Sequence, residues 1–554
     1  MLVKASVSLP SFHIRSRRDE RRDDGLDGCD STDTRAEESR TAIYNNSLSA
    51  TILRVREDVP LAGGALFMGK HNRLDREERK QMETHFKLLI GSSLVEGAAG
   101  SFDVINPATG KAFATCPKAS KGQLDEAVAA AKAAFPAWAA KAASDRGALL
   151  GRLADALEAR AAEFASLLTR EQGKPTDQAM GEIIGCTFVM RAFVDKHPAP
   201  VVLRDEGGNT VIEHRTPLGV IAAITPWNFP MILMMNKLAP ALVTGNTMVL
   251  KPAPTTPLTS LLFAELASEI LPAGVFNVIC DENELGAHLT AHPDIAKIAF
   301  TGSTATGKKV MASAATMVKR VTLELGGNDA AIVLDDLDPK AVAKKVYDGA
   351  MANAGQICVA IKRAYVPANM YDAFCEEVAR LANEAIVDDG SKQGTTIGPI
   401  QNRLQFDKVK ELVADAKLRG TVIAGGEPLE RDGYFMAPTI VRDLPDDARL
   451  VREEQFGPVL PILKYEDIDD VIARANDSEF GLGGTVWGKD VARAMDVAKR
   501  IDTGTVWVNQ HLAIDPNIPF RGSKQSGLGA ELGEDGMNEY TQAHIVNAVS
   551  FEEA

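Results

Sequence analysis

The hydrophobic pattern of the chain after Met82 alternates between two kinds of segment. Runs of three to five mostly apolar residues are separated by longer stretches in which apolar positions recur with helical spacing. The runs are Val220–Ile224, Thr247–Leu250, Val275–Ile279, Ile298–Phe300 and Ala330–Val333. Short apolar runs between helices predict parallel strands that are covered by helices on both faces. The pattern therefore predicts an α/β fold with a doubly wound, Rossmann-type sheet.

Two further regions extend this pattern. Residues 122–168 have the periodicity of helices, and we expect a break between two helices near Pro136 and Ala143–Ser144. Alternation resumes at Ala364–Pro367 and again over Thr421–Trp507. These later regions predict a second α/β domain.

One uncharged stretch has to be weighed as a membrane span. Thr216–Asn236 runs for 21 residues without a charge, which is long enough to cross a bilayer. Pro217, Pro226 and Pro230 divide it, and each removes a backbone donor that lipid cannot replace. We therefore expect a buried strand and turn, and no membrane partner.

Residues 1–81 differ in character from the rest. Basic and acidic residues are almost equal in number there and gather in runs such as Arg17–Arg22, with little apolar periodicity. Such a segment cannot bury enough surface to offset its ordering entropy, so we expect a disordered tail or an artefact of an upstream start. A transit peptide is the alternative, although transit peptides are poor in acidic residues.

Composition narrows the class of protein. The 61 basic and 75 acidic residues leave a formal net charge of −14, which argues against a partner bound through nucleic-acid phosphates. Six scattered cysteines without a CxxC pair predict neither a disulfide scaffold nor a metal site. We expect a cytoplasmic protein.

The segment Gly302–Lys309 follows an apolar run and precedes a helical stretch. Its spacing is close to that of a P-loop, but Lys309 stands where the magnesium-binding hydroxyl belongs. A P-loop nucleotidase is therefore an alternative rather than the first choice. A glycine turn before a helix can also bind the pyrophosphate of a dinucleotide, or it can be an ordinary turn.

Three further segments carry side chains that suit catalysis. The turn Thr225–Pro230 presents Asn228, whose amide could donate to a developing oxyanion or merely form the turn. Glu324 follows an apolar run, and apolar surroundings suit a carboxylate to general-base work, although most glutamates are exposed. Cys358 follows a helical stretch and could be a nucleophile or an inert buried thiol.

Together and in this order, the four segments resemble the signatures of the NAD(P)-dependent aldehyde dehydrogenase superfamily. Glu324 and Cys358 are 34 residues apart, a separation typical of that family. Later segments resemble it too, namely Glu453–Pro458, Gly504–Asn509, Pro519–Gly527 and Glu539–Thr541. The resemblance covers the chain from about Phe86 to its end.

The resemblance implies oxidation of an aldehyde to a carboxylic acid. Cys358 would attack the carbonyl, Asn228 would hold the oxyanion, and Glu324 would activate the water that hydrolyses the thioester. Lys237 and Glu531 match positions that relay protons. A catalytically silent structural homologue remains as an alternative, although both Cys358 and Glu324 are present.

The resemblance also implies a dinucleotide cofactor. The matching positions are Thr225, Pro226, Trp227, Lys251, Gly302, Ser303, Leu325, Gly326, Glu454 and Phe456. NAD is the first expectation. NADP stays open, because Pro254 stands where NAD-preferring members often carry a glutamate that repels a 2′-phosphate.

Domains and partners follow from the same comparison. We expect a dinucleotide-binding domain at 82–200 and 216–323, a catalytic domain at 324–535, and an oligomerisation arm at 201–215 and 536–554. Because a two-stranded ribbon is marginal alone, the arm implies a homodimer or homotetramer.

The substrate is expected to be a small-molecule aldehyde. The side chains expected to line its pocket are Met231, Met235, Ile357, Val359 and the loop His511–Ile518. They are largely apolar and favour an uncharged aldehyde. Arg521 could bind a carboxylate, which leaves a semialdehyde as the alternative.

Overall fold

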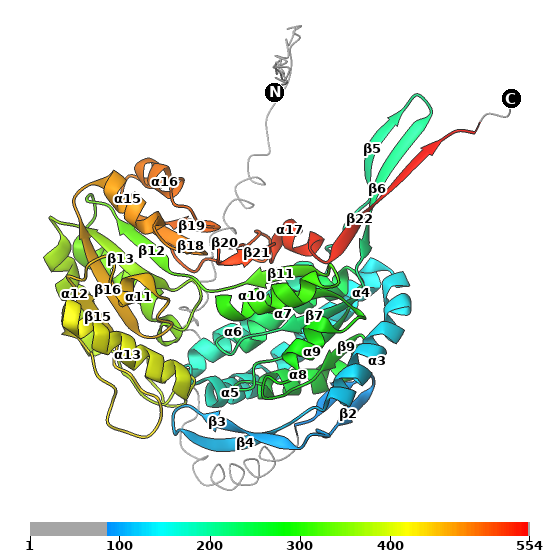
Figure 1. The fold of residues 1–554 in the computed structure, drawn as a ribbon, viewed down its shortest axis with the longest axis horizontal. Coiled ribbons are helices and arrows are strands. Elements are labelled where there is room, and N and C mark those ends of the chain that lie inside the picture. The colour runs from blue at the N-terminus through cyan, green and yellow to red at the C-terminus, as the bar shows by residue number, and fades with distance from the viewer. Residues whose placement is uncertain (1–85, 552–554) are drawn as a thin grey trace, which may run out of the picture. The chain divides into compact units, whose positions relative to one another are not determined.

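The computed structural model describes residues 86–551 (Figure 1). The predicted tail at 1–81 lies outside the described residues. Most strands belong to two large sheets, and the first has eight strands in the order β2-β1-β9-β8-β7-β10-β11-β21. Their bounds are β1 Leu88–Ile90, β2 Ser93–Val95, β7 Val220–Ile224, β8 Thr247–Lys251, β9 Phe276–Val278, β10 Ile295–Thr301, β11 Arg320–Glu324 and β21 Gly527–Leu528. Strands β9, β8, β7, β10 and β11 run parallel, as the apolar runs predict.

The strand order of this sheet reverses beside β7. From β7 the chain proceeds outward through β8 and β9, and then returns to place β10 and β11 on the other side of β7. The register aligns Ile224 with Lys251 and with Phe300, and Thr301 with Glu324. The carboxyl ends of these strands therefore share one edge, and the loops after β7 and β10 diverge there. Ligands of open α/β sheets bind in such a crevice.

Helices cover both faces of the first sheet. They are α3 Lys121–Ala140, α4 Ala143–Ala159, α5 Ala161–Gln172, α6 Thr176–Phe193, α7 Pro230–Val243, α8 Leu258–Ser268, α9 Gly286–Ala291 and α10 Thr304–Ala315. The break between the first two helices lies at Lys141–Ala142, whereas Pro136 lies inside α3. Pro136 is exposed, so the carbonyl that its ring leaves without a partner can be hydrated.

The uncharged stretch Thr216–Asn236 folds as a strand, a turn and a helix. It supplies the end of β6 (Asn209–Pro217), all of β7 and the first half of α7. Its central residues Ile221, Ala222 and Ala223 are completely buried in the first sheet. Within residues 86–551, no helix has both the length and the apolar character that a membrane crossing needs.

The second large sheet has seven strands in the order β14-β15-β16-β13-β12-β18-β19. Their bounds are β12 Asp329–Val333, β13 Ile361–Pro367, β14 Thr421–Ala424, β15 Thr439–Arg442, β16 Val459–Tyr465, β18 Gly483–Trp487 and β19 Thr505–Val508. The helices around it are α11 Pro339–Met351, α12 Tyr371–Glu384, α13 Arg403–Arg419, α14 Arg449–Arg452, α15 Ile468–Asn476 and α16 Val491–Ala498. The α/β prediction is thus confirmed for both regions.

The chain returns to the first sheet after building the second. Strand β21 lies within the predicted catalytic segment 324–535, yet it pairs antiparallel with β11, with Gly527 opposite Glu324. The helix α17 Gly533–Asn538 follows it. Residues near the C-terminus therefore lie at the same sheet edge as Glu324. The predicted domain boundaries themselves stay a prediction.

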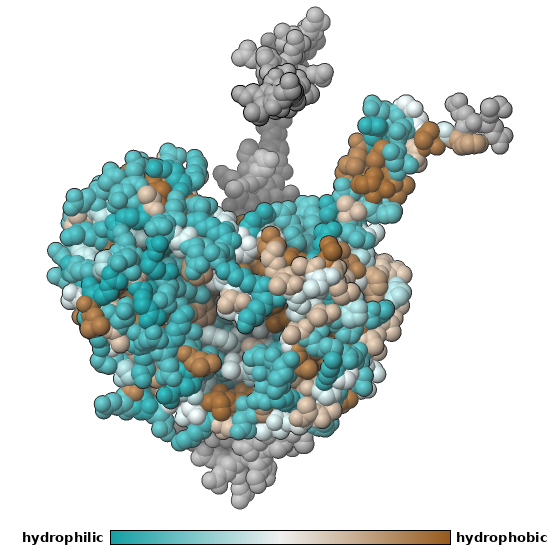
Figure 2. All heavy atoms as spheres, in the orientation of Figure 1, coloured by the Kyte–Doolittle hydropathy of each residue, from teal (hydrophilic) through white to brown (hydrophobic). Residues whose placement is uncertain are grey.

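A third sheet is built from β5 Val201–Glu206, β6 Asn209–Pro217 and β22 Thr541–Val549, which run side by side (Figure 1). The turn between β5 and β6 contains Gly207 and Gly208, both with positive φ, as a tight hairpin requires. Apolar side chains of this ribbon stay exposed, which gives the hydrophobic surface that Figure 2 shows on it; Val201, Val202 and Leu203 are each more than half exposed. Two smaller pairs are β3 Ser101–Asn106 with β4 Lys111–Pro117, and β17 Phe480–Gly481 with β20 Ser523–Lys524.

Candidate active site

Asn228 lies in the turn between β7 and α7, where Pro230 begins the helix at the position in which proline fits best. Its side chain is buried, with 3% of the residue exposed. The Nδ2 atom of Asn228 donates a hydrogen bond of 2.9 Å to the carbonyl of Gln356. Gln356 stands two residues before Cys358, so this bond joins the edge of the first sheet to the cysteine loop.

The loop before Cys358 has an unusual backbone. Asn353, Ala354 and Gly355 follow one another with φ of 49°, 53° and 71°. The left-handed region costs a non-glycine residue on the order of 1–3 kcal/mol, and such strain gathers at functional sites. The surroundings hold the loop, because the Lys362 ammonium donates to the carbonyl of Cys358 at 2.6 Å.

Cys358 is half-buried in the structure. Burial raises the pKa of Cys358 to about 12, Lys362 opposes this rise, and the acids Glu324 and Glu454 add to it. The sequence argument asks for positive potential at this thiol. Lys362 supplies such potential, but burial outweighs it. Cys358 is therefore a thiol at neutral pH and needs a base to become a nucleophile.

Glu324 ends β11 and is buried, with 4% exposed. Among the described residues, neither oxygen of its carboxylate has a hydrogen-bond partner. Burial raises the pKa of Glu324 well above its ordinary value; Glu531 raises it further and Lys237 lowers it. A buried acid with a raised pKa beside a thiol has the properties of a general base.

Lys237 and Glu531 form a buried ion pair at the same sheet edge. The Lys237 ammonium also donates to the hydroxyl of Thr301 at 2.6 Å. The amide of Asn236 contacts the second carboxylate oxygen of Glu531 at 3.5 Å. The electrostatic influence of both charges on Glu324 gives a group of three titratable side chains that could exchange protons.

Gly302 and Ser303 lie between β10 and α10. The Ser303 side chain caps the helix by accepting from the N–H of Thr306 at 3.3 Å. A Cβ at Gly302 would lie 2.6 Å from the ring of Phe300, so only glycine fits over that ring. The N-terminus of α10 thereby opens at the crevice beside β7, where free backbone N–H groups favour a phosphate.

The end of β7 and the end of β8 complete this side of the crevice. The N–H of Thr225 donates to the carbonyl of Lys251, and the Thr225 hydroxyl is buried with no partner among the described residues. Pro226 is half-buried beside it. The Lys251 ammonium pairs with the buried carboxylate of Asp281 at 2.7 Å. Asp281 was not foreseen from the sequence.

On the other side of the crevice, Glu454 lies against the Gly326–Gly327 turn. Its Oε1 atom accepts from the N–H of Gly327 at 2.9 Å, and a Cβ at Gly326 would lie 2.7 Å from its Oε2 atom. The rings of Phe456 and Trp227 meet edge to face, with centroids 5.4 Å apart. The second sheet thus faces the turn after β7 here.

Leu325 contacts both the segment before β21 and helix α10. It is buried, its N–H donates to the carbonyl of Ser526 at 2.8 Å, and its side chain packs against Gly307 in α10. Taken together, the helix terminus, the unpartnered Thr225 hydroxyl and the glycines that leave room for backbone contact fit a dinucleotide.

Apolar side chains surround the cysteine loop. Ile357 and Val359 form a small cluster with Leu482 and Trp507, and half-buried Phe229, Leu512, Ala513, Ile514 and Phe520 pack against it. Met231 and Met235, which were expected to line the pocket, are instead completely buried in the core of the first sheet. His511 is also buried, and its Nε2 atom lies 2.6 Å from the carbonyl of Val359. The exposed guanidinium of Arg521 pairs with Asp535.

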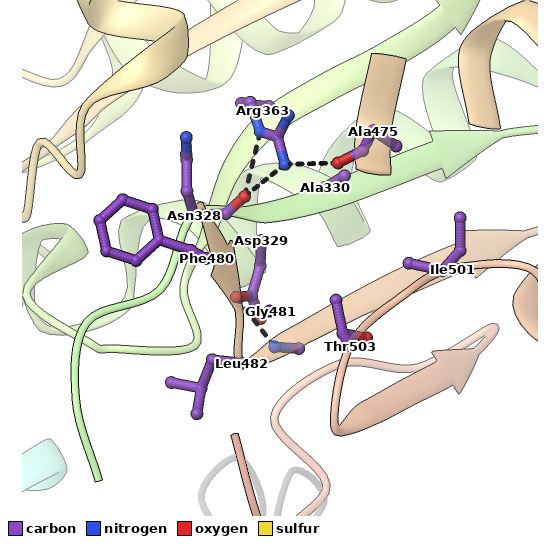
Figure 3. A pocket seen from close by; sticks show the side chains of 11 residues that line it. Asn328, Asp329, Ala330, Arg363, Ala475, Phe480, Gly481, Leu482, Ile501 and Thr503 are labelled. Carbon is purple, nitrogen blue, oxygen red and sulfur yellow. Dashed lines mark hydrogen bonds between the residues drawn. The ribbon is translucent and has the colours of Figure 1, made fainter. Parts of the chain in front are cut away.

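A separate small pocket lies beside β12 (Figure 3). Arg363 points into it and donates to the carbonyls of Asn328 and Ala475. Asp329 accepts from the N–H of Gly483 at 3.2 Å, and burial raises the pKa of Asp329 to about 7. These groups brace the strands beneath the cysteine loop.

Some of the residues that shape the site were missed from the sequence. Lys362 stabilises the cysteine loop, and Lys174 donates to the carbonyl of Asn228 at 2.9 Å. The one local signal for Lys362 is that it and Arg363 are adjacent charged residues in β13, whose other residues are apolar or aromatic. Lys174 lies in a loop after a helix and carries no signal of its own.

Comparison with known proteins identifies relatives over most of the chain. The sequence model of the aldehyde dehydrogenase family matches residues 94–546. An aldehyde dehydrogenase of Fusarium sp is 39% identical over 466 residues, covering 84% of this chain and 98% of the relative. The NADP(+) succinate-semialdehyde dehydrogenase GabD of Escherichia coli is 38% identical, covering 82% of this chain and 96% of its own.

Solved structures agree with this. A betaine aldehyde dehydrogenase from Staphylococcus aureus, in complex with NAD+, matches with a TM-score of 0.84 at 30% identity, covering 87% of this chain and 99% of its own. The NAD+ complex of an aldehyde dehydrogenase from Bacillus cereus matches with a TM-score of 0.83 at 35% identity, covering 86% and 98%. The fold and family expected from the sequence are thereby confirmed.

Proposed function

We propose, on the premise that this chain belongs to the aldehyde dehydrogenase family, that it oxidises an uncharged apolar aldehyde to the carboxylic acid with Cys358 as nucleophile and NAD as cofactor. The observation that carries the proposal is the meeting of three groups at one sheet edge. Asn228 bonds to the loop of Cys358, and Glu324 is close enough to raise the pKa of that thiol.

In the first step, Glu324 accepts the proton of the Cys358 thiol as sulfur attacks the carbonyl. The raised pKa of Glu324 suits this transfer, because a carboxylate that binds protons tightly is the better base, whereas the raised pKa of Cys358 opposes it and makes a base necessary. The Asn228 amide has a second hydrogen besides the one bound to Gln356, and it stabilises the oxyanion together with the N–H of Cys358. Each such donor is worth about 3 to 4 kcal/mol.

In the second step the acyl group leaves the enzyme. When bound, the nicotinamide dinucleotide supplies the hydride acceptor that turns the thiohemiacetal on Cys358 into a thioester. Once the proton taken from Cys358 has left Glu324, its carboxylate takes a proton from water, whose oxygen attacks the thioester and releases the acid from the Cys358 thiolate. Lys237 and Glu531 lie beside Glu324 and carry the proton away. A base in this position favours hydrolysis over transfer to a thiol acceptor.

The residues proposed to hold the cofactor come from the carboxyl ends of β7, β8, β10 and β11 and from the segment before β16. They are Thr225, Pro226, Trp227, Lys251, Gly302, Ser303, Leu325, Gly326, Glu454 and Phe456. Pro254, in place of the glutamate common in NAD-preferring relatives, leaves NADP open as the cofactor. The carboxylate of Asp281, however, neutralises the charge of Lys251. A 2′-phosphate near Lys251 therefore meets an ion pair rather than a free cation, and this favours NAD.

The substrate class follows from the side chains near Cys358. Phe229, Leu512 and Phe520 are half-buried and apolar, which suits an aliphatic or aromatic aldehyde. A semialdehyde, as in the name of the Escherichia coli relative, needs a cation for its carboxylate. Arg521 is the one candidate that the sequence offered, and its guanidinium already pairs with Asp535.

Absorbance of NADH tests the reaction with a panel of aldehydes and both cofactors. Cys358→Ala should abolish turnover, whereas Cys375→Ala, which removes a buried thiol from α12, should leave turnover within a few fold of the parent enzyme. Persistence of most activity in the first variant would remove Cys358 from the mechanism.

We further propose that the chain forms a homodimer or homotetramer through the third sheet. Exposed valine and leucine side chains on β5 support this, because apolar ribbons of this kind are marginal in water. Light scattering after size exclusion should give a multiple of the chain mass, and a monomer at micromolar concentration would contradict the proposal.

A further inference from the structure

The ammonium of Lys174 is completely buried beneath the turn that carries Asn228. It pairs with Glu182 of α6 at 2.5 Å, and neither side chain is exposed. The Lys174 Nζ atom also donates to the backbone carbonyl of Asn228 at 2.9 Å and lies 3.6 Å from the ring centroid of Phe229. This cation therefore contacts the two residues that precede α7.

Glu182 acts on the other end of the same turn. Its Oε1 atom accepts from the N–H groups of Met231 at 3.0 Å and Ile232 at 3.2 Å. These donors belong to the first turn of α7, whose N-cap residue Phe229 has no capping side chain of its own. The carboxylate thus does the work of a cap from a neighbouring helix. The ion pair therefore holds the backbone carbonyl of Asn228 and the first turn of the helix that follows it.

The segment that carries Lys174 is itself fixed. Gly173 has a φ of 100°, and a Cβ there would lie 2.8 Å from both Pro107 and Pro399. The hydroxyl and N–H of Thr176 both donate to the carbonyl of Gly390. The lysine therefore stands on a segment packed against Pro107, which follows β3, and against the connection between α12 and α13 that contains Gly390 and Pro399. Because its own segment is fixed, Lys174 can hold the carbonyl of Asn228 in one position.

A buried ion pair gives little net stability, because desolvation of both charges offsets their attraction. Its contacts here converge on one turn, and the Asn353 amide adds a second donor to the Asn228 carbonyl at 3.1 Å. We propose that Lys174 and Glu182 are positioning residues that aim the Asn228 amide at the substrate oxygen. This inference rests on the proposed function, in which Asn228 binds the oxyanion.

The test compares Lys174→Met in two backgrounds. Alone, the variant should slow the NADH burst by about 10- to 100-fold, a part of the loss that removal of a whole oxyanion donor causes. The Kd of NAD+ and the KM of the aldehyde should change less than about threefold, because uniform binding is untouched. In the Asn228→Ala background, Lys174→Met should cause almost no further loss.

A matched control separates positioning from general damage. Arg146 is another buried cation, and it donates to the carbonyl of Val243 at the opposite end of α7 at 2.9 Å. Arg146→Met should leave the burst rate within about threefold of the parent enzyme. An equal loss from Lys174→Met with and without Asn228 would overturn the inference, because a merely structural effect does not depend on that amide.

A double variant guards against the possibility that Lys174→Met alone fails to fold. Removing one partner of a buried pair leaves the other charge unpaired, so Lys174→Met also goes into a protein with Glu182→Gln. Circular dichroism and the denaturation midpoint establish that each variant is folded. If this double variant is folded and its burst rate equals that of the parent, the inference fails. If Cys358→Ala retains turnover, the proposed function fails instead.

Discussion

Replacement of Glu324 by glutamine tests the most demanding assignment in the site. The carboxylate is buried at the end of β11, and both of its oxygens lack hydrogen-bond partners among the described residues. Glutamine keeps the shape of the side chain but cannot accept a proton. The variant therefore removes the proposed base and leaves the surrounding packing in place.

The size of the effect follows from the role. A positioned general base contributes about 10²- to 10⁴-fold, which corresponds to about 3 to 5 kcal/mol of barrier. Water is a much weaker nucleophile than sulfur, so hydrolysis should lose more than the attack by Cys358. We expect kcat to fall by about 10²- to 10⁴-fold while NADH still appears in a burst of about one per active site.

The pH dependence gives a second, independent readout. Burial and Glu531 raise the pKa of Glu324, so the base is protonated and inactive at low pH, and kcat rises as pH increases through that pKa. Glu324→Gln should abolish this acid limb. Rapid mixing followed by steady-state turnover measures both effects, with exposed Glu534→Gln of α17 as control. Unchanged turnover with an unchanged acid limb would refute the assignment of the base.

Two further predictions concern the cofactor and stability. Asp281→Asn should free Lys251 and shift the ratio of the NAD+ and NADP+ dissociation constants at least about tenfold in favour of NADP+, since charges about 4 Å apart interact strongly near a protein surface. The control Glu282→Gln, at an exposed position, should not change this ratio. The same ratio in both variants would contradict the prediction. Burial raises the pKa of Glu171 from 4.5 to about 7, so the folded state binds this proton more tightly and stability falls as pH rises between these values. Glu171→Gln should remove about 3 kcal/mol of this pH dependence, measured by urea unfolding, and an unaltered slope would count against it.

Much of the fold follows from local pattern. The apolar run Val220–Ile224 coincides with β7, and the glycine turn at Gly302 stands at the start of α10 as expected. Both are local, because a buried strand needs only apolar side chains and a helix start needs only a cap. The helix break expected near Pro136 and Ala143–Ser144 falls at Lys141–Ala142, directly before Ala143; Pro136 itself lies inside α3, because an exposed helix face tolerates proline.

The residues that were missed act over long distances in the chain. Lys174 donates to a carbonyl 54 residues later, and Lys251 meets an acid 30 positions away. The expectation about NADP rests on Pro254 alone, whereas Asp281, the acid that pairs with Lys251, follows the next strand, β9. Nothing local distinguishes Asp281 from an exposed aspartate. Only the packed sheet brings these groups together.

The bond between the Asn228 amide and the Gln356 carbonyl joins an edge of one large sheet to a loop of the other. The proposed nucleophile, Cys358, and the proposed oxyanion donor, Asn228, are therefore carried by segments of different sheets. A displacement of about 1 Å between the two large sheets would therefore abolish activity and leave every helix and strand intact. Urea should accordingly abolish turnover at concentrations well below those at which circular dichroism shows a loss of secondary structure.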